Sequence, residues 1–303
     1  MPINLHCHSL FSVDGWLTPE EIADAMGEAG ITTLSLTDHN TVDGLSRCRR
    51  RARQLGIRFI DGIEFDGLWR AHEYHLLAFG PDADNPALRR LCERQFRQYA
   101  INFERFLPIV TRRYGVTRRQ LQAGLPERYR THPAPVLNKW FARGFLLSRG
   151  IFTDPDKARH AMSDVATEAE GHLDRPWAWA GVPEIIETVH AAGGILLLAH
   201  PAGHRRGDLP AQLKLIEEML ALGLDGFELY HPSNRIESHF PELEAAARRL
   251  GCMVSGGSDT HGSARRPPGD PGVPDWVLDT FPEDVLAGAD AGAEGKEETS
   301  CPA

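Results

Sequence analysis

The stretch Ile3-Asn4-Leu5-His6-Cys7-His8 decides how this chain is interpreted. A short strand is expected there, and it ends in two histidines one residue apart. Because successive side chains of a strand point to opposite faces, His6 and His8 share one face and Cys7 points the other way. Two neutral imidazoles side by side can hold one divalent metal ion. For this motif alone, the alternative is a pair of partly buried histidines that cap a sheet.

The same arrangement recurs in four further places. Strand-forming or small residues run into a metal-capable side chain at residues 34–37 before Asp38-His39, 59–63 before Glu64, 195–199 before His200, and 254–258 before Asp259-Thr260-His261. Five such endings in one chain are difficult to assign to chance. They predict a shared metal cluster.

Composition limits the class of protein. The chain has 303 residues, a net charge of −9 and five cysteines. No stretch approaches the roughly 20 apolar residues that cross a bilayer, and no signal-peptide pattern precedes the first strand, so we expect a cytoplasmic protein. The cysteines are widely spaced and form no C-x-x-C pair, which argues against disulfides and a thiolate zinc site.

Positive charge is concentrated in one segment of an otherwise acidic chain. Residues 89–149 contain fourteen Lys or Arg residues and three acidic ones. A basic segment beside a carboxylate-rich remainder suggests an anionic ligand at their junction. The alternative for most of these arginines is a solvated helical surface.

A unit of helix, glycine and strand repeats along the chain. Thr18-Pro19-Glu20-Glu21 has the N-cap, proline and capping-box glutamate of a helix start, and Gly30 follows that helix. Similar helices are expected to end before Gly56, Gly193, Gly223 and Gly251. Alternating elements with apolar strands predict a parallel sheet covered by helices, either a barrel or a doubly wound sheet, with ligands beyond the carboxyl ends of the strands. No nucleotide-binding glycine fingerprint follows a strand, which favours the barrel.

An insertion interrupts this repeat. Residues 86–114, 117–123 and 135–147 have helical patterns, and the aromatic side chains of Phe96, Tyr99, Phe103 and Phe106 are expected to form the insertion's core rather than a base-stacking platform. We therefore expect a discontinuous barrel of residues 1–81 and 181–286, with a helical subdomain of residues 82–180 inserted into it. Residues 287–303 are rich in Ala, Gly and Glu and are expected to be a disordered tail.

Five motifs together resemble the successive signatures of the PHP (polymerase and histidinol phosphatase) family. They are His6-Cys7-His8, Thr37-Asp38-His39, Gly62-Ile63-Glu64, Ala199-His200-Pro201 and Gly257-Ser258-Asp259-Thr260-His261. The resemblance implies an α/β fold, a distorted (β/α)7 TIM-like barrel, and metal-dependent phosphoesterase activity. The insertion, with Arg130-Thr131-His132, is similar to the branch that includes 3′,5′-nucleoside bisphosphate phosphatases and a 5′-to-3′ exoribonuclease.

The resemblance also implies three sets of metal ligands for two or three ions of Mn²⁺, Fe²⁺ or Zn²⁺. The sets are His6, His8, Glu64 and Asp259; Asp14, His39 and His261; and Glu64, His75 and His200, with Glu64 bridging. Asp14 stands where some relatives carry histidine, which favours a harder ion than zinc there. Such a cluster would neutralise phosphate oxygens and make hydroxide available near neutral pH.

Other residues are assigned to catalysis and substrate binding. Glu64 is expected to be essential to catalysis. Asp38 is expected to orient His39 or the attacking water, with an exposed strand-end carboxylate as the alternative. His231 is a candidate for protonating the leaving group or contacting the substrate, and a structural role is the alternative. Arginine suits phosphate, and the substrate-binding candidates are Arg130, His132, Arg94 and Arg97.

The chain departs from this branch at residues 174–179, Asp-Arg-Pro-Trp-Ala-Trp, where relatives often have a Gly-Lys-Pro loop. Arg175 could replace the lysine, while Trp177 or Trp179 could stack on a base or seal the subdomain interface. We expect hydrolysis of a phosphate ester of a small nucleotide or of the 5′ end of a short oligonucleotide, with no membrane or obligate protein partner. The alternatives are another small phosphate, such as histidinol phosphate or a cyclic phosphodiester, and a nucleic-acid binding module that uses the basic insert.

Overall fold

The protein is a mixed α/β molecule in a computed structural model that describes residues 2–127, 137–171, 178–205, 208–235, 239–262 and 266–286. Seven strands form one sheet in the order of the sequence. They are β1 (Ile3–Asn4), β2 (Thr33–Leu36), β3 (Arg58–Trp69), β4 (His72–Phe79), β5 (Ile195–Leu198), β6 (Gly226–Tyr230) and β7 (Met253–Gly256). The strands predicted from the apolar runs are all present.

The sheet is not wholly parallel, and this corrects the sequence-based expectation. β4 runs antiparallel to both β3 and β5, while the other neighbouring strands are parallel. The cause is a hairpin between β3 and β4, in which Arg70 and Ala71 both have positive φ, 48° and 62°. A two-residue turn of this kind joins antiparallel strands. As a result β3 continues beyond Glu64, which lies inside the strand and not at its end as predicted.

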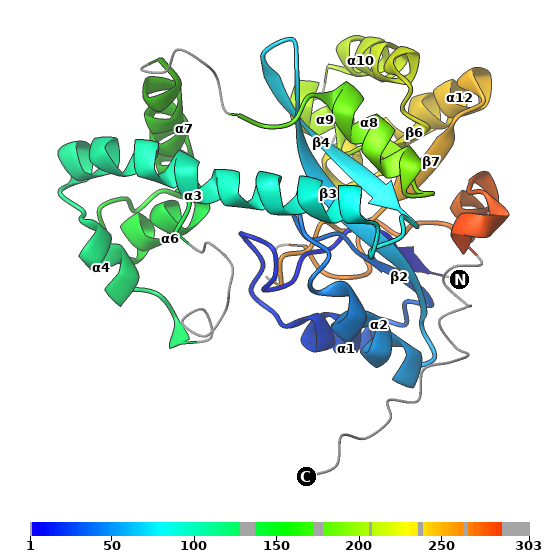
Figure 1. Cartoon of the computed structure of the whole chain (residues 1–303), viewed down its shortest axis with the longest axis horizontal. Coiled ribbons are helices and arrows are strands. Elements are labelled where there is room, and N and C mark those ends of the chain that lie inside the picture. Colours follow the sequence, from blue (N-terminus) through cyan, green and yellow to red (C-terminus); the bar gives the residue numbers. More distant parts are fainter. Residues whose placement is uncertain are drawn as a thin grey trace.

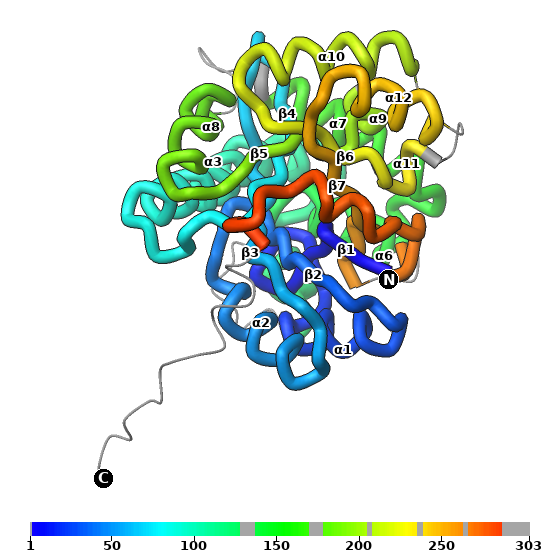
Figure 2. Tube along the Cα trace, turned by 90° about the vertical axis from the view of Figure 1, so that its right-hand side faces the viewer, coloured from blue at the N-terminus to red at the C-terminus, as the bar shows by residue number. Residues whose placement is uncertain are grey.

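Capping residues and glycines set the ends of the helices on the two sides of the sheet. α1 (Pro19–Glu28) has the predicted capping box, in which Thr18 and Glu21 satisfy each other's backbone N–H groups. Gly223 follows α10 (Leu209–Leu222), and its φ of 110° explains the glycine there. Figures 1 and 2 show α1 and α2 (Leu45–Gln54) on one side of the molecule, and α8 (Val182–Ala191), α10 and α12 (Phe240–Leu250) on the other. Shorter helical segments are α9 (Pro201–Arg205), α11 (Pro232–Arg235) and the 3₁₀ helix η1 (Asp275–Thr280).

The end of the first strand meets the end of the last. The backbone N–H of Leu5 donates to the carbonyl of Gly256 over 3.0 Å, and that of Asp259 donates to the carbonyl of His6 over 2.8 Å. Gly257 permits this approach, because a Cβ on it would lie 2.4 Å from the His6 nitrogen. The first and last motifs are thereby placed beside each other, although some 250 residues separate them.

The described part of residues 86–171 is mostly helical, as the sequence patterns predict. The predicted helical segment 86–114 forms one helix, α3 (Pro86–Tyr114). Two more predicted segments correspond to α4 (Arg118–Ala123) and α6 (Lys139–Ser148). The sequence did not reveal α7 (Pro155–Gly171). In Figure 1, α3 extends from the sheet to the left, where α4, α6 and α7 gather around its far end.

Two apolar cores share α3. Leu88 and Leu91 at its start belong to the core of the sheet, while Phe103 and Phe106 belong to a separate core with side chains of α4, α6 and α7. Phe96 and Tyr99 are exceptions to the predicted aromatic core, because Phe96 packs against Leu10 and the hydroxyl of Tyr99 donates to Asp66 of β3. The helix therefore connects the insertion to the sheet through buried contacts.

Two further expectations concern the chain as a whole. Among the residues that the structure describes, no helix is long and apolar enough to span a membrane. The predicted tail, residues 287–303, lies outside the described residues.

Candidate metal centre

His6 and His8 share one side of the chain, as the strand periodicity predicts. The Nε2 atoms of both histidines lie 3.1 Å from Glu64 Oε2, and they lie 3.4 and 3.2 Å from Asp259 Oδ1. All four side chains are buried. Cys7 points the other way, with its thiol 3.3 Å from the Ser35 carbonyl oxygen. The structure therefore brings together the four residues predicted to form the first ligand set.

A second group forms beside the first. His261 Nε2 lies 3.0 Å from Asp14 Oδ2, and His39 Nε2 lies 3.7 Å from the same oxygen. The ring of His8 stacks between those of His39 and His261, with centroids 4.9 and 4.4 Å away. Asp14, His39 and His261 thus converge as predicted.

Glu64 uses its second oxygen for a third group. Its Oε1 lies 2.9 Å from His75 Nδ1 and 3.1 Å from His200 Nε2. His75 reaches the cluster from inside β4, because the antiparallel register puts Asp66 opposite His75 and Glu64 two residues further along the same face. The β3–β4 hairpin, which the sequence did not predict, therefore places His75 in the cluster.

The backbone is strained at the cluster. Asp259 and His200 have positive φ values of 50° and 27°, and so does Asn40, next to His39, at 53°. Such values are uncommon for residues other than glycine and concentrate at functional sites, where the surrounding structure holds them in place.

Three residues at the cluster were not predicted from the sequence: Glu228, Asp66 and Arg266. Glu228 Oε1 lies 2.9 Å from His6 Nδ1, and Asp66 Oδ1 lies 3.2 Å from His75 Nε2, so each carboxylate faces the outer nitrogen of a clustered imidazole. Arg266 pairs with Asp259. Strand alternation could have identified Asp66, two residues after Glu64. Arg266 follows the last strand in a loop that no motif marks.

Electrostatics couple these groups. Burial alone would raise the pKa of Glu64, but the imidazoles of His39, His6 and His75 hold it well below its usual value. Burial would lower the pKa of His6, yet Glu228 and Glu64 raise it to about 9. Burial lowers the pKa of His200 to about 3. Glu64 is therefore ionised, and the two neighbouring histidines His6 and His200 have opposite tendencies to hold a proton.

Asp38 and His231 occupy different positions relative to the cluster. The carboxylate of Asp38 accepts hydrogen bonds from the backbone N–H of Ser9 over 2.5 Å and from its hydroxyl over 2.6 Å. His231 Nε2 lies 3.2 Å from Asp259 Oδ2, and its Nδ1 lies 2.6 Å from the Ser233 hydroxyl. His231 thus contacts the cluster directly, whereas Asp38 holds the loop that follows His8.

Two of the arginines predicted to bind substrate, Arg94 and Arg97, are exposed and pair with carboxylates of helices. Arg94 pairs with Glu184 at 2.5 Å, and Arg97 with Glu93 at 3.4 Å. Both arginine side chains are more than half exposed, at 55% and 76%. Arg130, His132, Arg175 and Trp177 lie outside the described residues.

The donor set fits a divalent cation. His8 Nε2 is buried and has no hydrogen-bond partner, although two carboxylate oxygens lie within 3.2 Å of it. Imidazole nitrogens and carboxylate oxygens that converge on one place are suited to Mn²⁺, Fe²⁺ or Zn²⁺. Without a cation, this buried nitrogen would be left unsatisfied.

Comparison with known proteins agrees with this geometry. The PHP domain family model matches residues 4–118. A 5′-3′ exoribonuclease of Haemophilus influenzae is 29% identical over 262 residues, which are 85% of this chain and 89% of the relative. A phosphoribosyl 1,2-cyclic phosphate 1,2-diphosphodiesterase of Eggerthella lenta is 29% identical over 88% of this chain and 96% of its own length. A 3′,5′-nucleoside bisphosphate phosphatase of Chromobacterium violaceum is 28% identical over 86% of this chain and 87% of its own.

Solved structures share the fold. A proposed metal-dependent phosphoesterase from Bifidobacterium adolescentis superposes with a TM-score of 0.75 at 23% identity, over 95% of this chain and 98% of that one. An amidohydrolase from Chromobacterium violaceum with bound sulfate gives 0.74 at 22% identity, over 95% and 97%. The PHP domain family model thus matches the first part of this chain, and the three relatives named above are similar to it along most of its length.

Proposed function

We propose that the protein is a metal-dependent phosphoesterase that hydrolyses a phosphate ester of a small nucleotide, of the 3′,5′-bisphosphate type, or the 5′ end of a short oligonucleotide. The observation that carries this proposal is the convergence of His6, His8, Glu64 and Asp259, which come from three distant parts of the chain. The named activities of the relatives support the substrate class.

We assign the clustered donors to two or three divalent ions. His6, His8, Glu64 and Asp259 would hold the first; Asp14, His39 and His261 the second; and Glu64, His75 and His200 the third. When bound, such ions neutralise phosphate oxygens and lower the pKa of a coordinated water. The protein would hold the carboxylates in their ionised form and the imidazoles in their neutral form, in the positions that bind the ions.

Within this scheme, Glu228 and Asp66 orient imidazoles, and Arg266 contacts the phosphate. Each carboxylate faces the nitrogen of a ligand histidine that points away from Glu64. A carboxylate in this position fixes the tautomer of the imidazole and its ring orientation. The guanidinium fork of Arg266 suits phosphate oxygens and lies beside Asp259. Arg130 and His132 remain proposed substrate contacts.

His231 is proposed to contact the substrate and to support Asp259. Burial lowers the pKa of its imidazole to about 3, so the ring is neutral at pH 7 and holds no spare proton for the leaving alcohol. Asp38 is proposed to act through Ser9, because both of its oxygens accept hydrogen bonds from that residue. Neither residue is assigned the role of proton donor.

At the level of the fold, we propose that the seven-stranded sheet closes into the distorted TIM-like barrel typical of the family. The hydrogen bonds between the ends of β1 and β7 support closure. We also propose that residues 82–180 form an inserted subdomain, which the separate apolar core around Phe103 and Phe106 supports.

A cyclic phosphodiester of a phosphorylated sugar is a second candidate substrate. The Eggerthella lenta relative, whose name states this activity, matches 88% of the chain at 29% identity. A role as a nucleic-acid binding module is less well supported. Several arginines of the basic segment already pair with carboxylates, among them Arg94 with Glu184 and Arg118 with Glu104.

The test is a comparison of substrates with a matched pair of variants. Phosphate release from a nucleoside 3′,5′-bisphosphate, a 5′-phosphorylated oligonucleotide and a cyclic sugar phosphate is measured with added Mn²⁺. Glu64→Gln should lower turnover at least about 100-fold, because even the loss of a residue that supports a ligand typically costs 10–100-fold. Glu20→Gln, at an exposed ion pair with Arg47, should retain activity.

Circular dichroism should show that both variants are folded. Unchanged turnover in Glu64→Gln would contradict the proposal. Salt-sensitive nucleic-acid binding without turnover would instead support the binding module.

A further inference from the structure

A small pocket lies between the insertion and the hairpin, next to the metal centre. Side chains of β4, α3, α6 and α7 surround it, together with Trp179, which follows α7 in the described chain. The lining residues used below are Glu73, Tyr99, Asn102, Lys139, Trp140 and Trp179. The sequence alone left two roles open for Trp179, stacking on a base or sealing the subdomain interface, and indicated no role for Trp140 or Lys139.

Side chains that line the pocket contact residues of the proposed metal centre. The indole N–H of Trp179 donates to Glu73 Oε2 over 2.7 Å, and Glu73 Oε1 lies 3.7 Å from His75 Nε2. Tyr99 donates its hydroxyl to Asp66, whose other oxygen faces His75. Trp179 is therefore linked to the proposed metal ligand His75 through Glu73, and Tyr99 is linked to it through Asp66.

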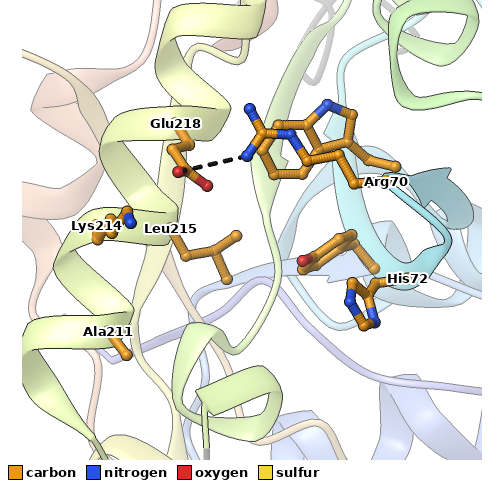
Figure 3. A pocket seen from close by; sticks show the side chains of 8 residues that line it. Arg70, His72, Ala211, Lys214, Leu215 and Glu218 are labelled. Atoms are coloured by element: carbon orange, nitrogen blue, oxygen red, sulfur yellow. Dashed lines mark ion pairs between the residues drawn. The ribbon is translucent and has the colours of Figure 1, made fainter.

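Strand alternation decides which pocket adjoins the centre. Glu73 and His75 share one face of β4, and Tyr74 points to the other. A larger pocket, of about 330 Å³, lies on the Tyr74 side between the hairpin and α10. Figure 3 shows its lining side chains, with the ion pair between Arg70 and Glu218 as a dashed line. The small pocket is the one on the metal side.

Its walls have the chemistry of a nucleobase site. The rings of Tyr99 and Trp179 lie 5.0 Å apart in an edge-to-face arrangement, and Trp140 contributes a third aromatic ring. Asn102, Lys139 and Glu73 supply hydrogen-bond donors and acceptors at the same place. A sugar phosphate alone needs no aromatic wall, whereas bases stack on aromatic side chains and use polar groups along their edges.

We propose that this pocket binds the base of the substrate nucleotide while its phosphate lies at the metal centre. The proposal rests on the proposed function and names the part of the substrate that the insertion recognises. The enclosed space is about 40 Å³, too small for a base, so Trp140 must turn outward as the base enters. Trp140 is 38% exposed and is the wall that has room to turn.

The experiment compares one substrate with and without its base. The specificity constant kcat/KM is measured for adenosine 3′,5′-bisphosphate and for 1,2-dideoxyribose 3,5-bisphosphate, which has the same two phosphates and no base. Stacking on an aromatic side chain contributes about 1–3 kcal/mol per base, so the wild-type protein should prefer the nucleotide at least about 5-fold. Trp140→Ala should reduce this preference toward unity, chiefly through KM, and Trp140→Phe should restore part of it.

Ile101→Ala is the matched control, because Ile101 is exposed on α3 and does not line the pocket. It should keep the wild-type preference. An equal preference in the wild-type protein and Trp140→Ala, or no preference in the wild-type protein, would overturn the proposal.

A binding measurement separates this proposal from the proposed function. Adenosine and ribose, neither of which carries a phosphate, are titrated into the wild-type protein by calorimetry. The proposal predicts that adenosine binds, that ribose does not, and that Trp140→Ala weakens adenosine binding. If neither bisphosphate is hydrolysed, the proposed function fails, and these titrations still decide for or against the base pocket.

Discussion

At the scale of single residues, Glu64 organises the centre. Its two oxygens lie within 3.4 Å of five imidazole nitrogens, from His6, His8, His39, His75 and His200. A buried carboxylate among so many nitrogen donors is stable only if positive charge accompanies it. Protons supply that charge in the metal-free protein, and cations would replace them.

Asp66 offers a test of how the surrounding residues act on the ligands. Its carboxylate faces His75 Nε2 at 3.2 Å and accepts a hydrogen bond from Asn40 over 2.5 Å. We expect Asp66→Asn to weaken binding of one metal ion roughly 10–100-fold, because the amide cannot fix the imidazole in the same way. Titration with Mn²⁺, followed by calorimetry, measures this affinity. Asp84→Asn, at an exposed carboxylate, is the control and should bind like the wild-type protein.

A loss of affinity in both variants would contradict this assignment, as would unchanged affinity in Asp66→Asn. The melting temperature of each variant distinguishes a local effect on the metal from a general loss of stability.

Proton release gives a second test at this scale. The carboxylates Glu228 and Glu64 outweigh burial and raise the pKa of His6 to about 9 in the metal-free protein, so the imidazole carries a proton at pH 7. A metal ion binds only the deprotonated form. Metal affinity should therefore increase as the pH rises from 7 to 9, and binding at pH 7 should release protons. Calorimetry in buffers of different ionisation enthalpy counts them; zero release would contradict the prediction.

Most of the proposed ligand residues could be predicted from the sequence because they follow a recognisable strand, whereas Asp14 and His75 were assigned from the family resemblance. Asp66, Glu228 and Arg266 could not be selected in the same way. A carboxylate that orients an imidazole is defined by its distance from that ring, and the partners are separated by 222 residues for His6 and Glu228. Only the fold brings them together.

At the scale of elements, the β3–β4 hairpin determines the site more than any helix does. It carries Glu64 and Asp66 on one strand and Glu73 and His75 on the other. The apolar run before Glu64 predicted β3, but a pattern of buried residues does not encode the direction of the strand that pairs with it. The turn at Arg70 and Ala71 contains no Gly or Asn, the usual signals of such a hairpin, so the antiparallel pairing was not predicted.

That turn is a place where stability can be gained. Ala71 is exposed and has a φ of 62°, a conformation that costs an alanine roughly 1 kcal/mol and a glycine almost nothing. Ala71→Gly should therefore raise the free energy of unfolding by about 0.5–1 kcal/mol. Chemical denaturation measures the change. Ala100→Gly, at an exposed position inside α3, should lower it by a similar amount, and a decrease in both variants would contradict the account of the turn.

At the scale of the whole molecule, the sheet and its loops carry the proposed metal ligands, and the helices of residues 86–171 contribute most of the wall of the proposed base pocket. The alternation of helices and strands predicted the first, and helical periodicity predicted the second. Their junction could not be predicted, because the sequence does not show that Tyr99 turns from the insertion's core to Asp66, or that Trp179 reaches Glu73. These contacts connect the substrate pocket to the metal centre.

We propose that the converging histidines and carboxylates hold divalent ions that the protein needs for phosphate-ester hydrolysis. The most direct measurement is phosphate release from a nucleoside 3′,5′-bisphosphate by protein stripped with a chelator, before and after Mn²⁺, Fe²⁺ or Zn²⁺ is restored. We predict that stripping abolishes release and that at least one of these ions restores it in proportion to the metal bound. Full activity in the stripped protein, or metal binding that Glu64→Gln leaves unchanged, would contradict the claim.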